Sequence, residues 1–265
     1  MKELRARSVD DLAEVGEAAV CMGVFDGVHL GHLALIAATV QAARQRGLQA
    51  VALVFDPHPD EVIRPGTRVA RLAPLRENLR RLTEAGIDVP LPLRFDDDLR
   101  ALTAGEFLQA MAPQIRVRAL AMSPESAFGR DRAGTPEAME ALGRTAGFDV
   151  VRVERLVTDG PTAISSGRIR RILAEGAIEE AVRLLGHPAY LEGTLSSRDA
   201  SASLRFAYQP ALPGPGHYRA RIRDGGGSVQ ADDLTLTVDS EGNVMLRAGA
   251  QAQAERVALD LLSRA

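Results

Sequence analysis

Short apolar segments alternate with amphipathic ones from the N-terminus to Leu185, and this alternation constrains the fold more than any other feature. The apolar segments are typical of buried strands and the amphipathic ones of helices. Strands that alternate with helices form a parallel sheet with helices on both faces, and such sheets bind ligands at the carboxyl ends of their strands. The predicted strands are 18–24, 49–55, 89–95, 117–122 and 149–155, and the predicted helices are 31–45, 75–85, 104–111, 136–145, 166–175 and 178–185.

The pattern changes near Pro188, where short alternating segments follow one another between turn clusters. Strands are predicted at 191–195, 202–208, 217–223, 234–238 and 244–247, and a helix at 252–262. This texture predicts a small antiparallel barrel or sandwich with a C-terminal helix. We therefore expect an α/β domain over residues 1–187 and a small β domain over residues 188–265.

Composition argues against several classes of protein. The 32 basic and 35 acidic residues give a formal net charge of −3, so no overall basic field points to nucleic acid. No apolar run reaches the roughly 18 residues of a membrane span, and the N-terminal stretch lacks the basic region of a signal peptide. Cys21, the single cysteine, cannot form an internal disulfide. We expect a cytoplasmic protein with neither a nucleic-acid nor a membrane partner, and with an oligomeric state that the sequence leaves open.

Lys2 is the only lysine in the chain, which limits how a phosphate can be bound. A Walker A loop needs an internal lysine at the phosphates, so this class of site is excluded. Any phosphate site must use arginines, backbone amides and hydroxyls. The acidic run 96–98 is either a solvated loop or a group that recruits Mg²⁺.

The first predicted strand runs into the sequence GVFDGVHLGH at a strand-to-helix turn. Glycines let a phosphate approach the backbone, and the following helix presents free amides and the positive end of its dipole. Two imidazoles at such a turn can stabilise charge that develops on an α-phosphorus, as nucleotidyl transfer requires. The alternative is two incidental histidines in a loop. The candidate residues in this turn are His29, Gly31 and His32.

Two further segments are candidates for the same site. Pro57, His58 and Pro59 form a stiff turn after the second strand, because each proline fixes its own φ. In the segment ISSGRIRRIL, Ser165 or Ser166 suits a helix N-cap, and arginines follow in the first turns. An anion there would meet amides, hydroxyls and guanidinium groups together. The alternatives are an ordinary strand exit and a capped helix with a solvated basic face.

These three segments, in this order, resemble the adenylyltransferase module of the prokaryotic bifunctional FAD synthetases (riboflavin kinase/FMN adenylyltransferase). The family shows G-x-F-D-G-x-H-x-G-H, a P-H-P turn and I-S-S-x-R-I-R, and it ends near a Leu-Leu-Gly sequence that is 184–186 here. The resemblance covers roughly residues 18–192. It implies a Rossmann-like nucleotidyltransferase domain that converts ATP and FMN, with Mg²⁺, into FAD and pyrophosphate.

The resemblance also implies roles for individual residues. His29 and His32 would stabilise the α-phosphate in the transition state. The turn 57–59 would lie near the flavin and its phosphate. Residues that match the ATP-binding loop and the β/γ-phosphate loop are Gly23, Phe25, Asp26 and Gly31 for the first, and Ser165, Ser166, Arg168 and Arg170 for the second.

Two departures from the family pattern affect the expected function. The stretch 123–127 differs from the family's G-x-D/N-F-x sequence, with Glu125 in place of the usual polar residue, and this region helps to hold the flavin in the family. After Gly193 the chain lacks the family's P-T-A-N kinase sequence, which predicts a barrel without riboflavin kinase activity. Two alternatives remain: nucleotidyl transfer to a different phosphorylated acceptor, and a non-catalytic nucleotide or flavin sensor.

Overall fold

The computed structural model describes residues 7–154, 156–198, 201–223, 228–247 and 256–265. These residues form two compact units. The first unit comprises Met1–Val69 and Leu75–Ala163, and the second comprises Ala70–Pro74 and Ile164–Ala265. The predicted limit of the nucleotidyltransferase domain at residue 187 is not the boundary between these units, and it stays a prediction about function.

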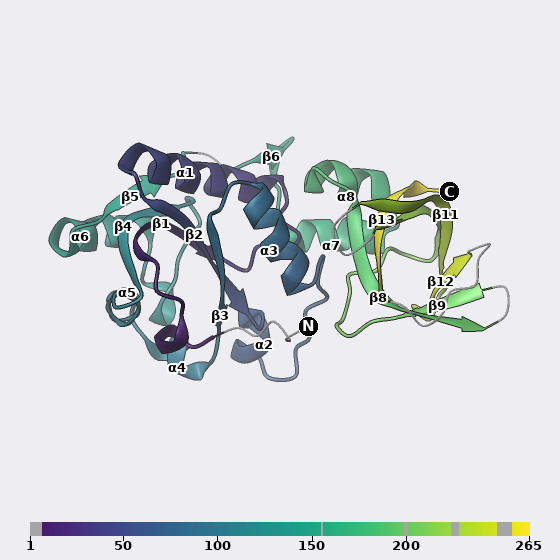
Figure 1. Ribbon diagram of the computed structural model, residues 1–265, viewed down its shortest axis with the longest axis horizontal. Coiled ribbons are helices and arrows are strands. Elements are labelled where there is room, and N and C mark those ends of the chain that lie inside the picture. The colour runs from purple at the N-terminus through teal and green to yellow at the C-terminus, as the bar shows by residue number, and fades with distance from the viewer. Residues whose placement is uncertain (1–6, 155, 199–200, 224–227, 248–255) are drawn as a thin grey trace. The chain divides into compact units, whose positions relative to one another are not determined.

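The first unit is built on a parallel sheet with the strand order β3-β2-β1-β4-β5 (Figure 1). This confirms the predicted parallel α/β architecture. The order reverses between β1 and β4, and such a switch point is where doubly wound sheets bind ligands. The strands are β1 (Gly16–Gly23), β2 (Gln49–Asp56), β3 (Val89–Arg94), β4 (Ile115–Met122) and β5 (Asp149–Arg152).

Helices cover both faces of this sheet because successive strand residues point to opposite sides. In β1, Ala18 and Val20 belong to one buried core cluster, and Ala19 and Cys21 belong to the other. The principal helices are α1 (Leu30–Arg46), α3 (Leu75–Glu84), α5 (Ala104–Met111) and α6 (Pro136–Ala146). Helices α1 and α3 contribute to the cluster of Ala19, and α5 and α6 contribute to the cluster of Ala18.

Several short elements of the first unit were not predicted from periodicity. Helix α2 (Pro59–Ile63) is capped by His58, and helix α4 (Asp97–Ala101) is capped by Asp96, whose carboxylate accepts a hydrogen bond from the Leu99 amide. The acidic run at 96–98 is thus the beginning of a helix. The remaining short elements are two 3-10 turns (Val9–Asp11 and Arg130–Arg132) and the hairpin of β6 (Thr158–Asp159) and β7 (Thr162–Ala163).

The second unit contains two helices and a closed antiparallel barrel with the strand order β10-β11-β12-β9-β8-β13. The predicted small β domain is therefore a barrel rather than an open sandwich. Its helices are α7 (Ser166–Ala174) and α8 (Ile178–Leu185), and its strands are β8 (Ala189–Arg198), β9 (Ser201–Arg205), β10 (Gly216–Arg223), β11 (Val229–Val238), β12 (Val244–Arg247) and β13 (Arg256–Arg264).

The predicted C-terminal helix at 252–262 is wrong, because residues 256–264 form strand β13 between β10 and β8. Residues 252–255 of that prediction lie outside the described residues. The strand buries side chains on both faces, with Leu259 on one and Asp260 on the other. An apolar run that is buried on both faces has no clear period of two, so it resembles a helix in sequence.

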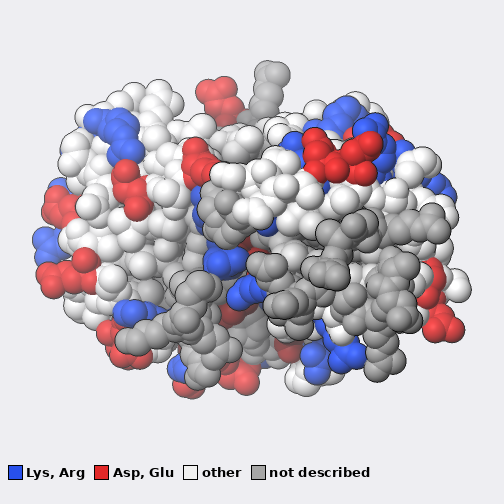
Figure 2. Space-filling model, turned by 45° about the vertical axis from the view of Figure 1, so that its right-hand side comes forward, with Lys and Arg blue, Asp and Glu red and all other residues white. Residues whose placement is uncertain are grey.

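Among the described residues, no helix combines the length and apolar character needed to cross a membrane. On the face drawn in Figure 2, basic and acidic side chains of the described residues lie in small groups beside one another. This interspersed pattern agrees with the nearly balanced charge of the sequence.

Candidate active site

The histidine turn joins the end of β1 to the beginning of α1 and brings two imidazoles into contact. His29 is the N-cap residue of α1, and His32 lies one turn further along the helix. Their rings stack with centroids 3.7 Å apart and planes inclined by 18°. Phe25 contacts the same pair, with its ring centroid 5.3 Å from that of His32. The structure thus places the two predicted catalytic histidines side by side.

Burial sets the charge of His32. Its partner His29 is 4% exposed, and the buried Asp26 lies in the same turn. Desolvation lowers the pKa of His32 well below its usual value of 6.5, and the neighbouring His29 lowers it further. His32 is therefore neutral at physiological pH, and its imidazole carries a single N–H that can donate to an oxygen.

The N-terminus of α1 is arranged to receive an anion. His29 makes no side-chain capping bond to the helix, and no acidic residue lies in its first turn. The first amides of a helix lack intrahelical partners, and the helix dipole favours negative charge there. Gly31, in this first turn, adds no side chain that would keep a phosphate away from the backbone.

The proline–histidine turn begins at the carboxyl end of β2, next to β1 in the sheet. Nδ1 of His58 accepts a hydrogen bond from the Asp60 amide at 3.2 Å. In the neutral imidazole the proton is therefore on Nε2, which is the donating atom. The peptide bond between Asp56 and Pro57 is cis, and Pro59 is the first residue of α2.

A pocket of about 850 Å³ opens at the carboxyl ends of β1, β2 and β4. Gly23 from the histidine turn and Pro59 from the proline turn both line it. The beginning of the histidine segment and the end of the proline turn therefore reach one cavity, as expected for loops that leave neighbouring parallel strands, whereas His29, His32 and His58 are not among the described residues that line it.

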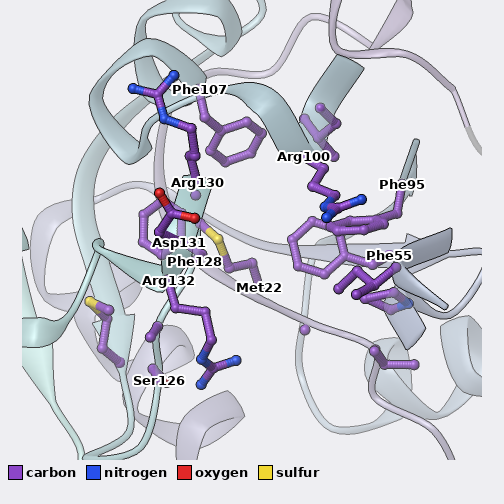
Figure 3. A pocket seen from close by; sticks show the side chains of 18 of the residues that line it. Met22, Phe55, Phe95, Arg100, Phe107, Ser126, Phe128, Arg130, Asp131 and Arg132 are labelled. Carbon is purple, nitrogen blue, oxygen red and sulfur yellow. The ribbon is translucent and has the colours of Figure 1, made fainter. Parts of the chain in front are cut away.

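Two pairs of aromatic rings form the apolar part of this pocket (Figure 3). Phe55 and Phe95 meet edge to face with centroids 5.6 Å apart, and Phe107 and Phe128 do so at 6.0 Å. The two pairs lie on different sides of the cavity, and Arg100 lies next to the first (Figure 3). Rings arranged in this way suit a planar aromatic ligand.

Polar groups from the loop after β4 complete the pocket. Glu125 lines it with an exposed carboxylate, and the Ser126 hydroxyl is bonded to the Ser123 amide at 2.9 Å. Gly129 has a φ of +71°, and a Cβ there would lie 2.5 Å from the backbone nitrogen of Ala104. This position therefore requires glycine. Because Arg130 and Arg132 follow Gly129 in the chain, its backbone conformation determines where these two arginines lie in the pocket lining.

Sequence patterns singled out Glu125 in this loop but not Phe95, Arg100 or Phe107. These three residues reach the pocket from the end of β3, from α4 and from α5. Apart from their place after a strand or on a helix, nothing in the local sequence marks them.

The third predicted segment lies in the second unit and forms the beginning of α7. The Ser165 hydroxyl accepts a hydrogen bond from the Arg168 amide at 3.3 Å, so Ser165 is the N-cap and Ser166 is the first helical residue. Nη2 of Arg168 lies 3.4 Å from a carboxylate oxygen of Glu180 on α8. Arg170 is on the same helix. The meeting of this segment with the histidine turn stays a prediction.

The described residues contain no group of three or more histidine, cysteine or acidic side chains placed to hold a metal ion. They therefore do not form a protein cage for Mg²⁺. Mg²⁺ commonly keeps several waters and binds through substrate phosphates instead of an all-protein cage.

Comparisons with known proteins identify the family of this chain. A family model described as FAD synthetase matches residues 12–168. The bifunctional riboflavin kinase/FMN adenylyltransferase of Escherichia coli is 34% identical over 196 residues, which is 73% of this chain and 62% of the relative. The protein of the same description from Listeria monocytogenes is 31% identical over 230 residues, covering 83% of this chain and 72% of the relative. A solved structure of a macrolide-efflux protein from Streptococcus pneumoniae has the same fold, with a TM-score of 0.83, 24% identity, and coverage of 98% of this chain and 89% of that one.

Proposed function

Because this chain belongs to the FAD synthetase family, we propose that it transfers the adenylyl group of ATP to FMN, giving FAD and pyrophosphate. The observation that carries the proposal is the stacked pair of His29 and His32 at a helix N-terminus whose turn also lines an aromatic pocket. A nucleotidyl transfer between two phosphates needs a site for each substrate and donors between them.

In the proposed reaction, a phosphate oxygen of FMN attacks the α-phosphorus of ATP. The bond from the α-phosphorus to the bridging oxygen breaks, and pyrophosphate leaves with that electron pair. The imidazole N–H groups of His29 and His32 stabilise the charge on the α-phosphate oxygens as it develops. The flavin ring occupies the aromatic pocket, with the 57–59 turn near its phosphate.

Arg168, Arg170 and the hydroxyls of Ser165 and Ser166 are proposed to hold the β- and γ-phosphates of ATP. Guanidinium groups suit this role in a chain with no internal lysine, because they bind phosphate oxygens through two parallel hydrogen bonds. Mg²⁺ is proposed to accompany the triphosphate.

The second part of the proposal is that the chain lacks riboflavin kinase activity. It is supported by the sequence after Gly193, which has no P-T-A-N motif although a closed barrel forms there. This chain matches 62% of the length of the Escherichia coli relative. Any activity of the whole relative is therefore assigned to this chain only as a proposal.

A second candidate is transfer to a different phosphorylated acceptor. Glu125 favours it, because an exposed carboxylate lines the pocket where the family has a polar or smaller acidic residue. A carboxylate repels a ligand that presents an anionic group to it and accepts hydrogen bonds from a ligand that presents donors. It therefore changes which acceptor the pocket binds more tightly. A non-catalytic sensor is a third candidate, and it predicts binding without turnover.

The proposal is tested by incubating the protein with ATP, Mg²⁺ and either FMN or riboflavin, and separating the products by chromatography. We expect FAD from FMN and no product from riboflavin. FMN formed from riboflavin would overturn the second part. Pyrophosphate release with another acceptor, but not with FMN, would favour the second candidate, and binding without any release would favour the sensor.

A further inference from the structure

The backbone of the histidine turn is held in an unusual conformation. Phe25 has a φ of +50°, Gly27 of +79° and Val28 of +40°, so three of four successive residues lie in the left-handed region. Only glycine adopts this region without steric cost, and side chains there persist only where the surroundings enforce them. Phe25 and Val28 are both buried in the core beneath α1.

A side chain from a distant helix holds the centre of this turn. The Gly27 amide donates a hydrogen bond of 3.0 Å to the side-chain oxygen of Asn78 on α3. Asn78 is 2% exposed, and α3 is anchored next to it by Leu82, which is fully buried in the core that also contains Phe25 and Val28. The bond therefore links a rigid helix to a buried amide in the middle of the turn.

The chain on either side of Gly27 contacts the imidazole pair. Two residues earlier, the Phe25 ring contacts His32. Two residues later, His29 begins α1 and stacks on His32. A rotation of the peptide at Gly27 would displace both neighbours of the His32 ring at once.

We propose that Asn78 is a positioning residue for the histidine pair, acting through the Gly27 amide to keep His29 and His32 in their stacked arrangement. The role of the histidine pair in adenylyl transfer rests on the proposed function. The stacked arrangement of the two rings, which Asn78 maintains, is independent of that function.

The test compares two substitutions of Asn78 that have nearly the same size. Asn78→Leu removes the acceptor, and Asn78→Asp keeps an oxygen in its place. Because misplacement of a catalytic group by about 1 Å can cost on the order of 100-fold in rate, we expect Asn78→Leu to lower kcat for FAD formation by roughly 10- to 100-fold. We expect KM for ATP to change by less than about threefold and Asn78→Asp to recover most of kcat, because Asn78 touches neither substrate in the proposal.

Thr39→Val is the matched control. Thr39 is fully buried in the same unit, and its hydroxyl donates to the Leu35 carbonyl at 2.8 Å on α1, away from the turn. The substitution also removes one buried hydrogen bond and conserves shape. Equal losses of kcat in Asn78→Leu and Thr39→Val, or no recovery in Asn78→Asp, would overturn the proposal.

Hydrogen exchange supplies a readout that needs no activity, and its measurement on the wild-type chain needs no variant. We expect the Gly27 amide to be strongly protected, and peptides covering residues 25–33 to exchange faster in Asn78→Leu than in Thr39→Val. An unprotected Gly27 amide would overturn the proposal. If the wild type forms no FAD, the proposed function fails while this exchange comparison still decides the role of Asn78.

Discussion

At the scale of single residues, substitutions of His32 and of Arg168 are expected to affect catalysis and ATP binding differently. We expect His32→Ala to lower kcat by roughly two to three orders of magnitude with little change in ATP affinity, since removal of one transition-state donor has this effect. Arg168→Ala should instead weaken ATP binding. Steady-state kinetics of FAD formation and calorimetric ATP titration measure the two effects. His217→Ala, at an exposed histidine bonded to Thr237, is the control. Full turnover in His32→Ala would disprove the assignment.

The same residue predicts how stability depends on pH. The pKa of His32 is depressed in the folded state, so below about pH 6.5 the unfolded chain binds a proton that the folded chain does not. The contribution of His32 is therefore fully present above pH 6.5 and is lost as the pH falls towards the folded pKa, at up to about 1.4 kcal/mol per pH unit. Urea unfolding of wild type and His32→Gln between pH 5 and 7.5 measures it. Equal slopes for both proteins would contradict the prediction.

Single residues also mark the limit of what the sequence could predict at the site. The two histidines follow a strand and carry their own local pattern, and Ser165 is an N-cap that its serine–arginine context indicates. Asn78 has no such pattern, because its partner Gly27 is 51 positions away. Phe95 likewise reaches the pocket only because β3 ends beside β2. Cys21 is fully buried in the core, and burial raises its pKa to about 12.

At the scale of secondary-structure elements, α6 and β5 depend on one glycine. A Cβ on Gly143 would lie 2.3 Å from the backbone oxygen of Phe148, at the turn between these elements. We expect Gly143→Ala to destabilise the first unit by roughly 1–3 kcal/mol. The added methyl group would overlap a backbone oxygen, which cannot move aside as the end of a flexible side chain can. Gly105→Ala is the control, since its Cβ meets only Leu142 at an ordinary 3.8 Å. The control should stabilise α5 by roughly 0.5–1 kcal/mol through helix propensity. Thermal unfolding measures both, and equal effects would refute the argument.

Elements with one buried face were predicted with accurate limits, and elements without one were not. Helices α5 and α8 begin and end where their periodicity predicts, at 104–111 and 178–185. Strand β13 was mistaken for a helix because it is buried on both faces, so that its side chains carry no alternation. The 3-residue and 5-residue helices are set by single caps such as Asp96, and no periodicity can indicate so short an element.

At the scale of the whole molecule, the two compact units are not two consecutive segments of the chain. Residues 70–74 come from the first half of the sequence but belong to the second unit, where Ala73 packs with Tyr190 and Ala258. Strand–helix alternation predicts neighbours in a sheet, because sequential elements pack together. It contains no information about a five-residue segment that packs on a barrel more than 100 positions away. The fold class, a parallel sheet followed by a small antiparallel barrel, was therefore predictable, but this crossing of the chain was not.

Since each unit has its own core, we expect calorimetry of the intact chain to show two unfolding transitions. Asp260→Ala tests the assignment of the second transition. Asp260 is fully buried in β13, and its carboxylate accepts hydrogen bonds from Arg221 and Arg223 of β10 at 2.7 and 2.6 Å. Its loss leaves two guanidinium groups without their counter-charge, which costs roughly 3–5 kcal/mol in comparable buried pairs.

The expected pattern is reciprocal. Asp260→Ala should lower the transition of the barrel unit and leave the other within error, and Gly143→Ala should do the opposite, since the two sites lie in different cores. Arg219→Ala is the control for the barrel, because its ion pair with Asp233 is solvent-exposed and such pairs contribute about 0–1 kcal/mol. A single transition lowered equally by Asp260→Ala and Gly143→Ala would mean that the two cores unfold as one cooperative body, and the division into units would then describe packing density and not stability.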